Sequence, residues 1–208
     1  MISLIQKIQS SLKWRVSTIQ HETRHMEITS NPVEKTHTIY VPPPDAEWRD
    51  IEYLHELGHA YLAETVHPLF SSAYFAKGTP DTLVQILTWP KRTADDWFVD
   101  DLLMQWCPDE ERAEIEEHVD MAAMIDEPDN PIWVFGAGLM FAQAIEYQVK
   151  HPPVPKSVIP IVDILRSIRP GSPSLRNLRG LTNRLVSLVT KHQLVVTNHN
   201  GIDVWKVE

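Results

Sequence analysis

The chain has 208 residues, enough for one substantial domain with a small appendage. Hydrophobic residues make up 43% and charged residues 23%, a composition that excludes wholesale disorder and allows a packed core. The formal net charge of -9 disfavours unaided binding to a nucleic-acid backbone, and the single cysteine, Cys107, excludes an internal disulfide and a cysteine-rich metal site.

The acidic residues are concentrated in the first part of the chain. Residues 1–130 hold 24 acids and 10 bases, whereas residues 131–208 hold 4 acids and 9 bases. The N-terminal residues lack the continuous apolar stretch of a secretory signal. The most apolar run, 132–145, is shorter than the roughly 20 residues that a membrane span needs. We therefore expect a cytoplasmic protein with no membrane segment.

The first third of the chain is predicted to form a short helix, a small sheet and one long helix. The long helix covers residues 46–66 and ends at His67, because the residue before a proline is disfavoured in the helical region. The turn between the last two strands lies at Asn31-Pro32. The other elements are a helix at 2–12 and strands at 13–19, 26–29 and 36–41.

The middle of the chain is predicted to be helical. A helix over residues 93–104 follows a break at Trp89-Pro90. Pro108 then opens an acidic helix over 109–124, whose first turn carries acids where the helix dipole favours them. The apolar stretch 132–149 predicts a buried helix.

A proline-rich segment, 151–155, is predicted to be a stiff linker between domains at 1–150 and 152–208. Beyond it, helices at 157–168 and 181–192 precede a hairpin whose turn contains Asn200-Gly201. The basic residues of this part include Arg166, Arg169, Arg176, Arg179, Arg184 and Lys191. The order of elements resembles a winged-helix module, which implies contact with DNA or a protein through the last helix. The alternative is a capping subdomain with a solvated basic face.

Residues 55–59, inside the first long helix, read His-Glu-Leu-Gly-His. Histidines at i and i+4 lie on one helical face, one turn apart, and can bind one Zn²⁺ together. Glu56 is then expected beside the open coordination position, where it can take a proton from water that zinc has made acidic. Another metal, or a pair of surface histidines, is the alternative.

A strand followed by a helix bearing HExxH resembles the zincin metallopeptidases. The resemblance implies zinc and an edge strand that holds extended substrate, for which residues 36–41 are in position. Within the zincins the chain is most similar to the ImmA/IrrE-like group. The second motif of that group is followed loosely by residues 96–108, where Asp96 replaces Glu and Val99 replaces Ala.

The third metal ligand is expected from the aspartate-rich helix after Thr93. Asp96 is the first choice, because it shares a face with Val99 and fits the spacing of the group. Asp100 and Asp95 are the alternatives. Clustered aspartates in an otherwise apolar helix are costly if buried without a partner, which favours at least one facing a cation.

Two residues near the end of the motif helix are further candidates. Glu64 follows His59 by five residues, about 140° round an ideal helix, so we expect it to face away from the metal as a surface carboxylate. His67 is a candidate for stabilising an oxyanion or for supporting the metal ligands indirectly. A surface histidine is the alternative for His67.

The sequence thus predicts an α+β protein with a zincin-like domain and a small, winged-helix-like tail. The expected function is that of a zinc-dependent metalloendopeptidase, in which Glu56 acts as general base on the water that attacks a peptide bond. By resemblance, the substrate is a regulatory protein. The alternatives are a zincin-fold regulator or DNA-associated sensor with little or no proteolysis, and a structural zinc site without an open position.

Overall fold

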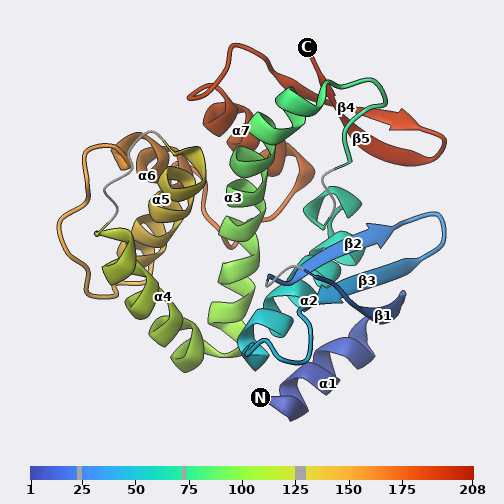
Figure 1. The fold of residues 1–208 in the computed structure, drawn as a ribbon, viewed down its shortest axis with the longest axis horizontal. Coiled ribbons are helices and arrows are strands. Elements are labelled where there is room, and N and C mark those ends of the chain that lie inside the picture. Colours follow the sequence, from blue (N-terminus) through green and yellow to red (C-terminus); the bar gives the residue numbers. More distant parts are fainter. Residues whose placement is uncertain (23–24, 72–73, 125–129) are drawn as a thin grey trace. The chain divides into compact units, whose positions relative to one another are not determined.

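The computed structural model describes residues 1–22, 25–71, 74–124 and 130–208, and it is a mixed α and β protein (Figure 1). Across these ranges no helix is both long and apolar enough to cross a membrane. The elements are α1 (Ile2–Ser11), β1 (Arg15–Gln20), β2 (Glu27–Asn31), β3 (Thr36–Val41), α2 (Asp50–Thr65), η1 (Pro68–Phe70), α3 (Asp81–Trp106), α4 (Pro108–Ala122), α5 (Pro131–Glu146), α6 (Ile159–Arg166), α7 (Leu175–Val186), β4 (Leu194–His199) and β5 (Ile202–Val207).

The chain falls into two compact units. The first consists of Met1–Ala76 together with Val196–Lys206, and the second of Lys77–Val195 together with Val207–Glu208. These units do not coincide with the domains predicted at 1–150 and 152–208, which stay a prediction. The difference arises because most of the C-terminal hairpin is bonded within the first unit, whereas α6 and α7 pack on helices of the second.

The first unit contains a three-stranded sheet in the order β1-β3-β2. β1 runs parallel to β3, from Arg15 opposite Thr36 onward, and β2 runs antiparallel to β3. β3 is therefore the central strand, and the prediction that residues 36–41 form the substrate-holding edge is wrong. The sequence hides this pairing, because β1 is largely exposed and shows little of the alternation that marks a half-buried strand.

Helix α2 lies against α1 and β2 in the first unit (Figure 1). It begins at Asp50, four residues later than predicted, and its apolar face contains Leu54 and Leu57, both fully buried. After α2 the chain makes the short 3₁₀ turn η1, which Pro68 opens. The helix thus ends just before the proline, as predicted, and the proline begins a 3₁₀ turn a few residues further along the chain.

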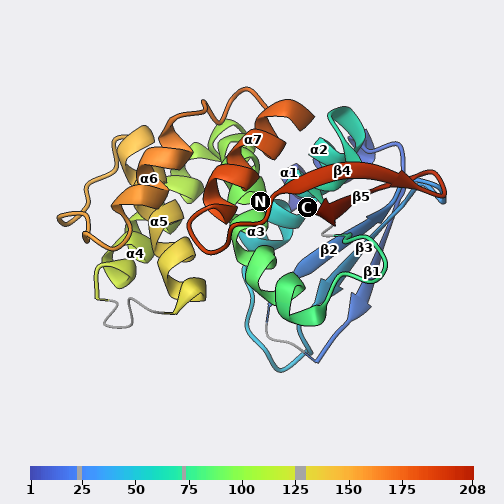
Figure 2. The same ribbon diagram turned by 90° about the horizontal axis from the view of Figure 1, so that it is seen from above.

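The C-terminal hairpin forms with the predicted turn. Asn200 and Gly201 have φ values of +52° and +82°, as a type I′ turn requires at both central positions. On the first unit, Trp205 of β5 bonds to the segment after η1: its N–H donates to the Tyr74 carbonyl and its carbonyl accepts from the Ala76 N–H, both at 2.7 Å. The hairpin is seen from above in Figure 2.

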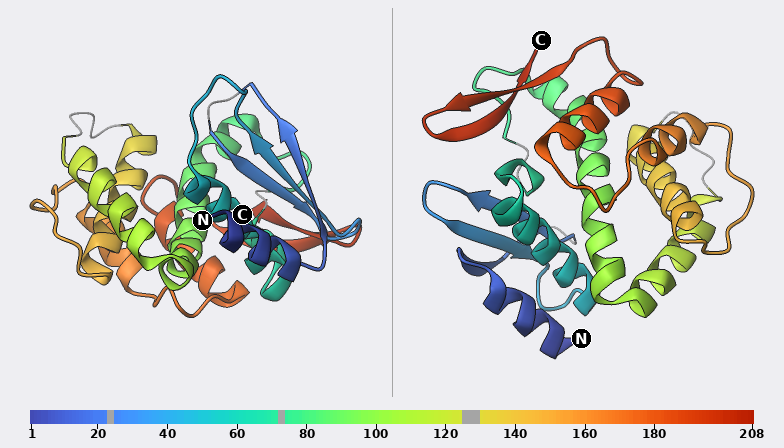
Figure 3. Two further views of the ribbon diagram at one scale, coloured as in Figure 1. Left: turned by 90° about the horizontal axis from the view of Figure 1, so that it is seen from below. Right: turned by 180° about the vertical axis from the view of Figure 1, so that it is seen from behind.

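The second unit is helical, and α3 contacts α4, α5 and α7 within it (Figure 3, right). The predicted break at Pro90 is wrong, because α3 continues through it. A proline inside a helix costs about 3 kcal/mol or more. Burial of Leu87 and Ala94, one turn on either side of Pro90 and both 0% exposed, offsets this cost. The acidic helix opened by Pro108 is present as α4.

Helices α6 and α7 complete the second unit. α7 begins at Leu175, six residues before the predicted start, because the Ser174 hydroxyl caps it by accepting from the Asn177 N–H at 3.1 Å. α6 packs closely on α5, and a Cβ added at Gly138 would collide with the Ile161 side chain. The six basic residues named above for this part of the chain are all exposed.

Candidate metal centre

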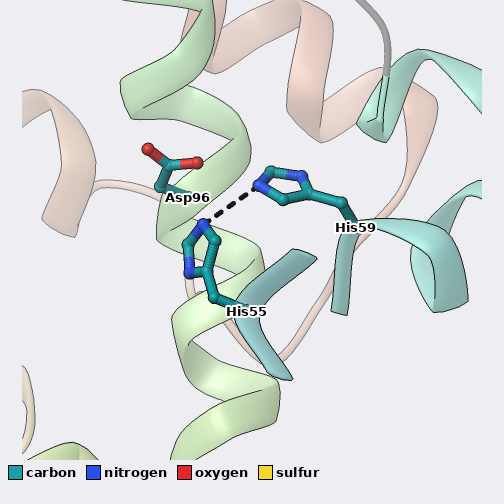
Figure 4. A group of neighbouring side chains, drawn as sticks. All are labelled: His55, His59 and Asp96. Atoms are coloured by element: carbon teal, nitrogen blue, oxygen red, sulfur yellow. Dashed lines mark hydrogen bonds between the residues drawn. The ribbon is translucent and has the colours of Figure 1, made fainter. Parts of the chain in front are cut away.

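His55 and His59 lie one turn apart on α2, and one nitrogen of each ring points toward the other ring (Figure 4). Their Nε2 atoms are 3.1 Å apart, and the ring planes meet at 73°. Two nitrogens that bind one zinc at about 2.0–2.1 Å in tetrahedral geometry lie about 3.3–3.4 Å from each other. The observed separation is therefore close to that of two imidazoles on a shared metal.

The orientation of His59 is set by its other ring nitrogen. Nδ1 lies 2.6 Å from the carbonyl oxygen of Phe70. A carbonyl can only accept a hydrogen bond, so Nδ1 carries the proton and Nε2 keeps its lone pair. Metal-binding histidines usually donate their second N–H to an oxygen in this way, which fixes both the tautomer and the ring.

The ligand-type atoms of His55, His59 and Asp96 lie within 4.8 Å of one another (Figure 4). Among the residues that the structure describes, these three form the group with the spacing of metal ligands. Two imidazole nitrogens and one carboxylate oxygen are a donor set that zinc takes, so the residues fit the expected metal. His59 is buried, and the other two are partly exposed.

The two alternative aspartates have partners in the second unit. Asp95 forms a buried ion pair with Lys91, one turn earlier on α3. Asp100 is also buried, and one of its carboxylate oxygens accepts from the Gln143 side-chain amide of α5. Neither belongs to the group with His55 and His59 within the described part of the chain. A buried carboxylate is costly without a polar partner, and Lys91 and Gln143 are the partners of these two aspartates.

Glu56 follows His55 on α2 and is 8% exposed. Burial of this carboxylate removes it from the solvated surface on which most glutamates lie. Glu56 is thus a buried carboxylate on the helix that carries both histidines. Its role as general base stays a prediction.

Glu64 is not the surface carboxylate that its helical position predicts. Its side chain is 5% exposed, and it accepts from the backbone N–H groups of Lys13 and Trp14 at 2.7 and 2.8 Å. It also contacts His37 Nε2 at 3.0 Å. The sequence hides these contacts because they join residues 27 to 51 positions apart.

His37, on the central strand, links Glu64 to Ser30. Its Nδ1 lies 2.5 Å from the Ser30 hydroxyl, and its ring stacks on Trp14 with centroids 5.0 Å apart. Burial lowers the pKa of His37, although the hydrogen bond and the charge of Glu64 act in the opposite direction. A neutral ring that donates from Nε2 to Glu64 and accepts at Nδ1 satisfies all three groups.

His67 lies between α2 and η1, with both ring nitrogens engaged. Nδ1 accepts from the Leu69 N–H at 3.3 Å, and Nε2 lies 3.0 Å from the Asp203 carboxylate of β5. Two roles were predicted for His67: stabilising an oxyanion and supporting the metal ligands indirectly. Because its Nε2 is engaged with Asp203, the geometry favours indirect support of the ligands. Asp203 was not predicted, because it lies 136 residues from His67 in the sequence.

Comparison with known proteins does not assign the chain to a family. No protein-family model matches the chain, and neither a curated protein nor a solved structure matches it.

Proposed function

We propose that this chain is a zinc-dependent hydrolase that cleaves peptide bonds, with His55, His59 and Asp96 as metal ligands. One observation carries the proposal: the Nε2 atoms of the two histidines meet at 3.1 Å while Phe70 holds His59 in the metal-binding tautomer. The HExxH motif and the resemblance to zincins support the choice of peptide bonds. The chemistry of the donors supports zinc.

Held by His55, His59 and Asp96, zinc would supply a strongly acidified water and would polarise the substrate carbonyl. Glu56 takes the proton from the attacking water and returns it to the leaving amine. The Phe70 carbonyl keeps the His59 ring from rotating, so Nε2 stays directed toward His55. To bind a metal through Nε2, His55 would have to release to solvent the proton with which this nitrogen donates to His59 in the metal-free protein.

An extended peptide would bind at a free edge of the sheet. With β3 in the centre, β1 and β2 are the edges at which strand addition can occur. We favour β2, because β2 contacts the helix that carries both histidines. Main-chain hydrogen bonds would then provide affinity with little dependence on the substrate sequence.

The first test is a metal measurement followed by proteolysis. The gently purified chain is expected to contain zinc or to take it up on titration. It is expected to cleave a denatured, labelled protein, whereas Glu56→Gln should retain zinc and lose at least about 100-fold in rate. Glu52→Gln is the matched control, because Glu52 lies on the same helix and its side chain is 36% exposed.

The outcomes separate the rival functions. Equal cleavage by wild type and Glu56→Gln would refute the hydrolytic role. Zinc uptake without any cleavage would favour the zincin-fold regulator or sensor. Absence of zinc together with no uptake would refute every metal proposal. DNA contact through the exposed basic residues of the second unit is tested on the full chain by salt-dependent binding.

A further inference from the structure

We propose that the C-terminal hairpin positions the metal site: Asp203, acting through His67 and the turn η1, holds the Phe70 carbonyl against His59. The proposal rests on the function proposed above, because it assigns the hairpin a role in the affinity of that site for metal. Every contact that carries it lies within the first unit.

The first link is the contact between Phe70 and His59. The Phe70 carbonyl accepts from His59 Nδ1 at 2.6 Å, and the Phe70 side chain is completely buried. Without this acceptor, the His59 ring is free to carry its proton on Nε2, the nitrogen that the metal needs. Partners of this kind typically affect metal affinity by about 10–100-fold when they are removed.

The second link is the hold of His67 on η1. The turn has three residues, Pro68–Phe70, and so short a 3₁₀ segment makes few hydrogen bonds of its own. The His67 carbonyl accepts the turn's own bond from the Phe70 N–H at 3.0 Å, and the His67 ring adds one more, because its Nδ1 accepts from the Leu69 N–H at 3.3 Å. In the proposal, this ring bond to the residue before Phe70 helps to set the direction of the Phe70 carbonyl.

The third link is the choice of tautomer by Asp203. His67 Nδ1 can accept from Leu69 only when the ring proton is on Nε2. The Asp203 carboxylate lies 3.0 Å from Nε2 and stabilises a proton there. Asn198 donates to the other carboxylate oxygen at 2.7 Å and so orients the group. Without Asp203, the Nδ1–H tautomer becomes accessible, and it cannot cap η1.

The hairpin is anchored strongly enough to act as a support. Trp205, two residues after Asp203, is fully buried and bonds to Tyr74 and Ala76, a few residues beyond η1. By contrast, the side chains of His67 and Asp203 are 16% and 33% exposed. Partly exposed pairs contribute little to stability. The pair therefore serves the geometry of the turn more than the stability of the fold.

The experiment compares Asp203→Ala and Asp203→Leu with wild type in the full chain. Zinc affinity is measured by competition with a chromophoric chelator, and the tautomers of His59 and His67 in the metal-free protein by ¹H–¹⁵N NMR. We expect Asp203→Ala to bind zinc about 10–100-fold more weakly. Its His67 and His59 rings should populate the other tautomer. Asp203→Glu should restore part of the affinity.

The control is Lys206→Ala, an exposed position on the same strand, which should change zinc affinity less than about two-fold. Circular dichroism establishes that each variant is folded. If Asp203→Ala does not fold, the decision rests on Asp203→Leu, whose side chain is similar in size to that of Asp203 and has no accepting oxygen.

Failure of this proposal is distinguishable from failure of the proposed function. If wild type binds zinc and the Asp203 variants bind it equally well, the positioning role is overturned and the metal site stands. If wild type takes up no zinc, the metal site is refuted, and so is the role of the hairpin in metal affinity. An unchanged His59 tautomer in both folded Asp203 variants would also overturn the positioning role.

Discussion

Replacement of Glu64 by alanine is expected to destabilise the first unit strongly. The Glu64 side chain is 5% exposed, and its oxygens accept from Trp14 N–H at 2.8 Å and contact His37 Nε2 at 3.0 Å. Both contacts are partly buried, whereas the third, from the Lys13 N–H, is exposed and can be replaced by water. Alanine therefore leaves two donors without partners.

The magnitude follows from those two donors. Each buried donor left unsatisfied costs about 1–3 kcal/mol, so the expected loss is about 2–6 kcal/mol in the free energy of unfolding. The lower figure already exceeds the effect of most surface substitutions, which stay within about 0.5 kcal/mol. Glu64→Gln should lose less, because its amide keeps one accepting oxygen.

Urea unfolding of the three proteins measures this loss. A chain of this size has an m-value of roughly 2–3 kcal/mol/M, so a loss of ~4 kcal/mol lowers the midpoint by about 1.3–2 M. Glu52→Ala is the control, since its side chain is 36% exposed on the same helix and pairs with nearby, exposed Arg49. A loss of less than about 1 kcal/mol for Glu64→Ala would refute the buried network and favour a surface carboxylate.

Three further predictions concern His37 and the aspartates of α3. Because burial lowers the pKa of His37, the unfolded chain binds a proton more readily, so stability should fall as pH drops below about 6.5, with a slope of at most ~1.4 kcal/mol per pH unit. Urea unfolding at pH 7.5 and 5.5 should show a smaller difference for His37→Asn than for wild type. Asp96→Asn should weaken zinc affinity at least about 10-fold in a chelator competition, and unchanged affinity would remove Asp96 from the ligand set. Asp95→Asn should instead cost about 3–5 kcal/mol in urea unfolding, because it removes the negative charge that compensates buried Lys91.

Local patterns in the sequence predicted most of the elements. The spacing of His55 and His59 fixes their placement on one helical face, and the structure brings their Nε2 atoms together. The Asn200-Gly201 pair predicts its hairpin because a type I′ turn needs positive φ at both positions. In each case the information lies within a few neighbouring residues.

The predictions that were wrong concern positions whose structure depends on contacts with residues distant in the sequence. Pro90 lies inside α3 because that helix is buried against other helices, a condition that a proline pattern does not report. The central place of β3 depends on its pairing with β1, about 20 residues away. The Glu64 side chain is buried because Lys13 and Trp14, just before β1, supply N–H donors about 50 residues earlier in the sequence.

The same distinction explains why the predicted site was incomplete. A motif such as HExxH specifies the atoms that bind a metal, because their spacing is local. It does not specify the groups that orient those atoms. Here the Phe70 carbonyl, 11 residues away, orients His59, and the support of Phe70 leads through His67 to Asp203, 136 residues further on. Since a metal ligand binds well only in one tautomer and orientation, such distant residues contribute to affinity without touching the metal.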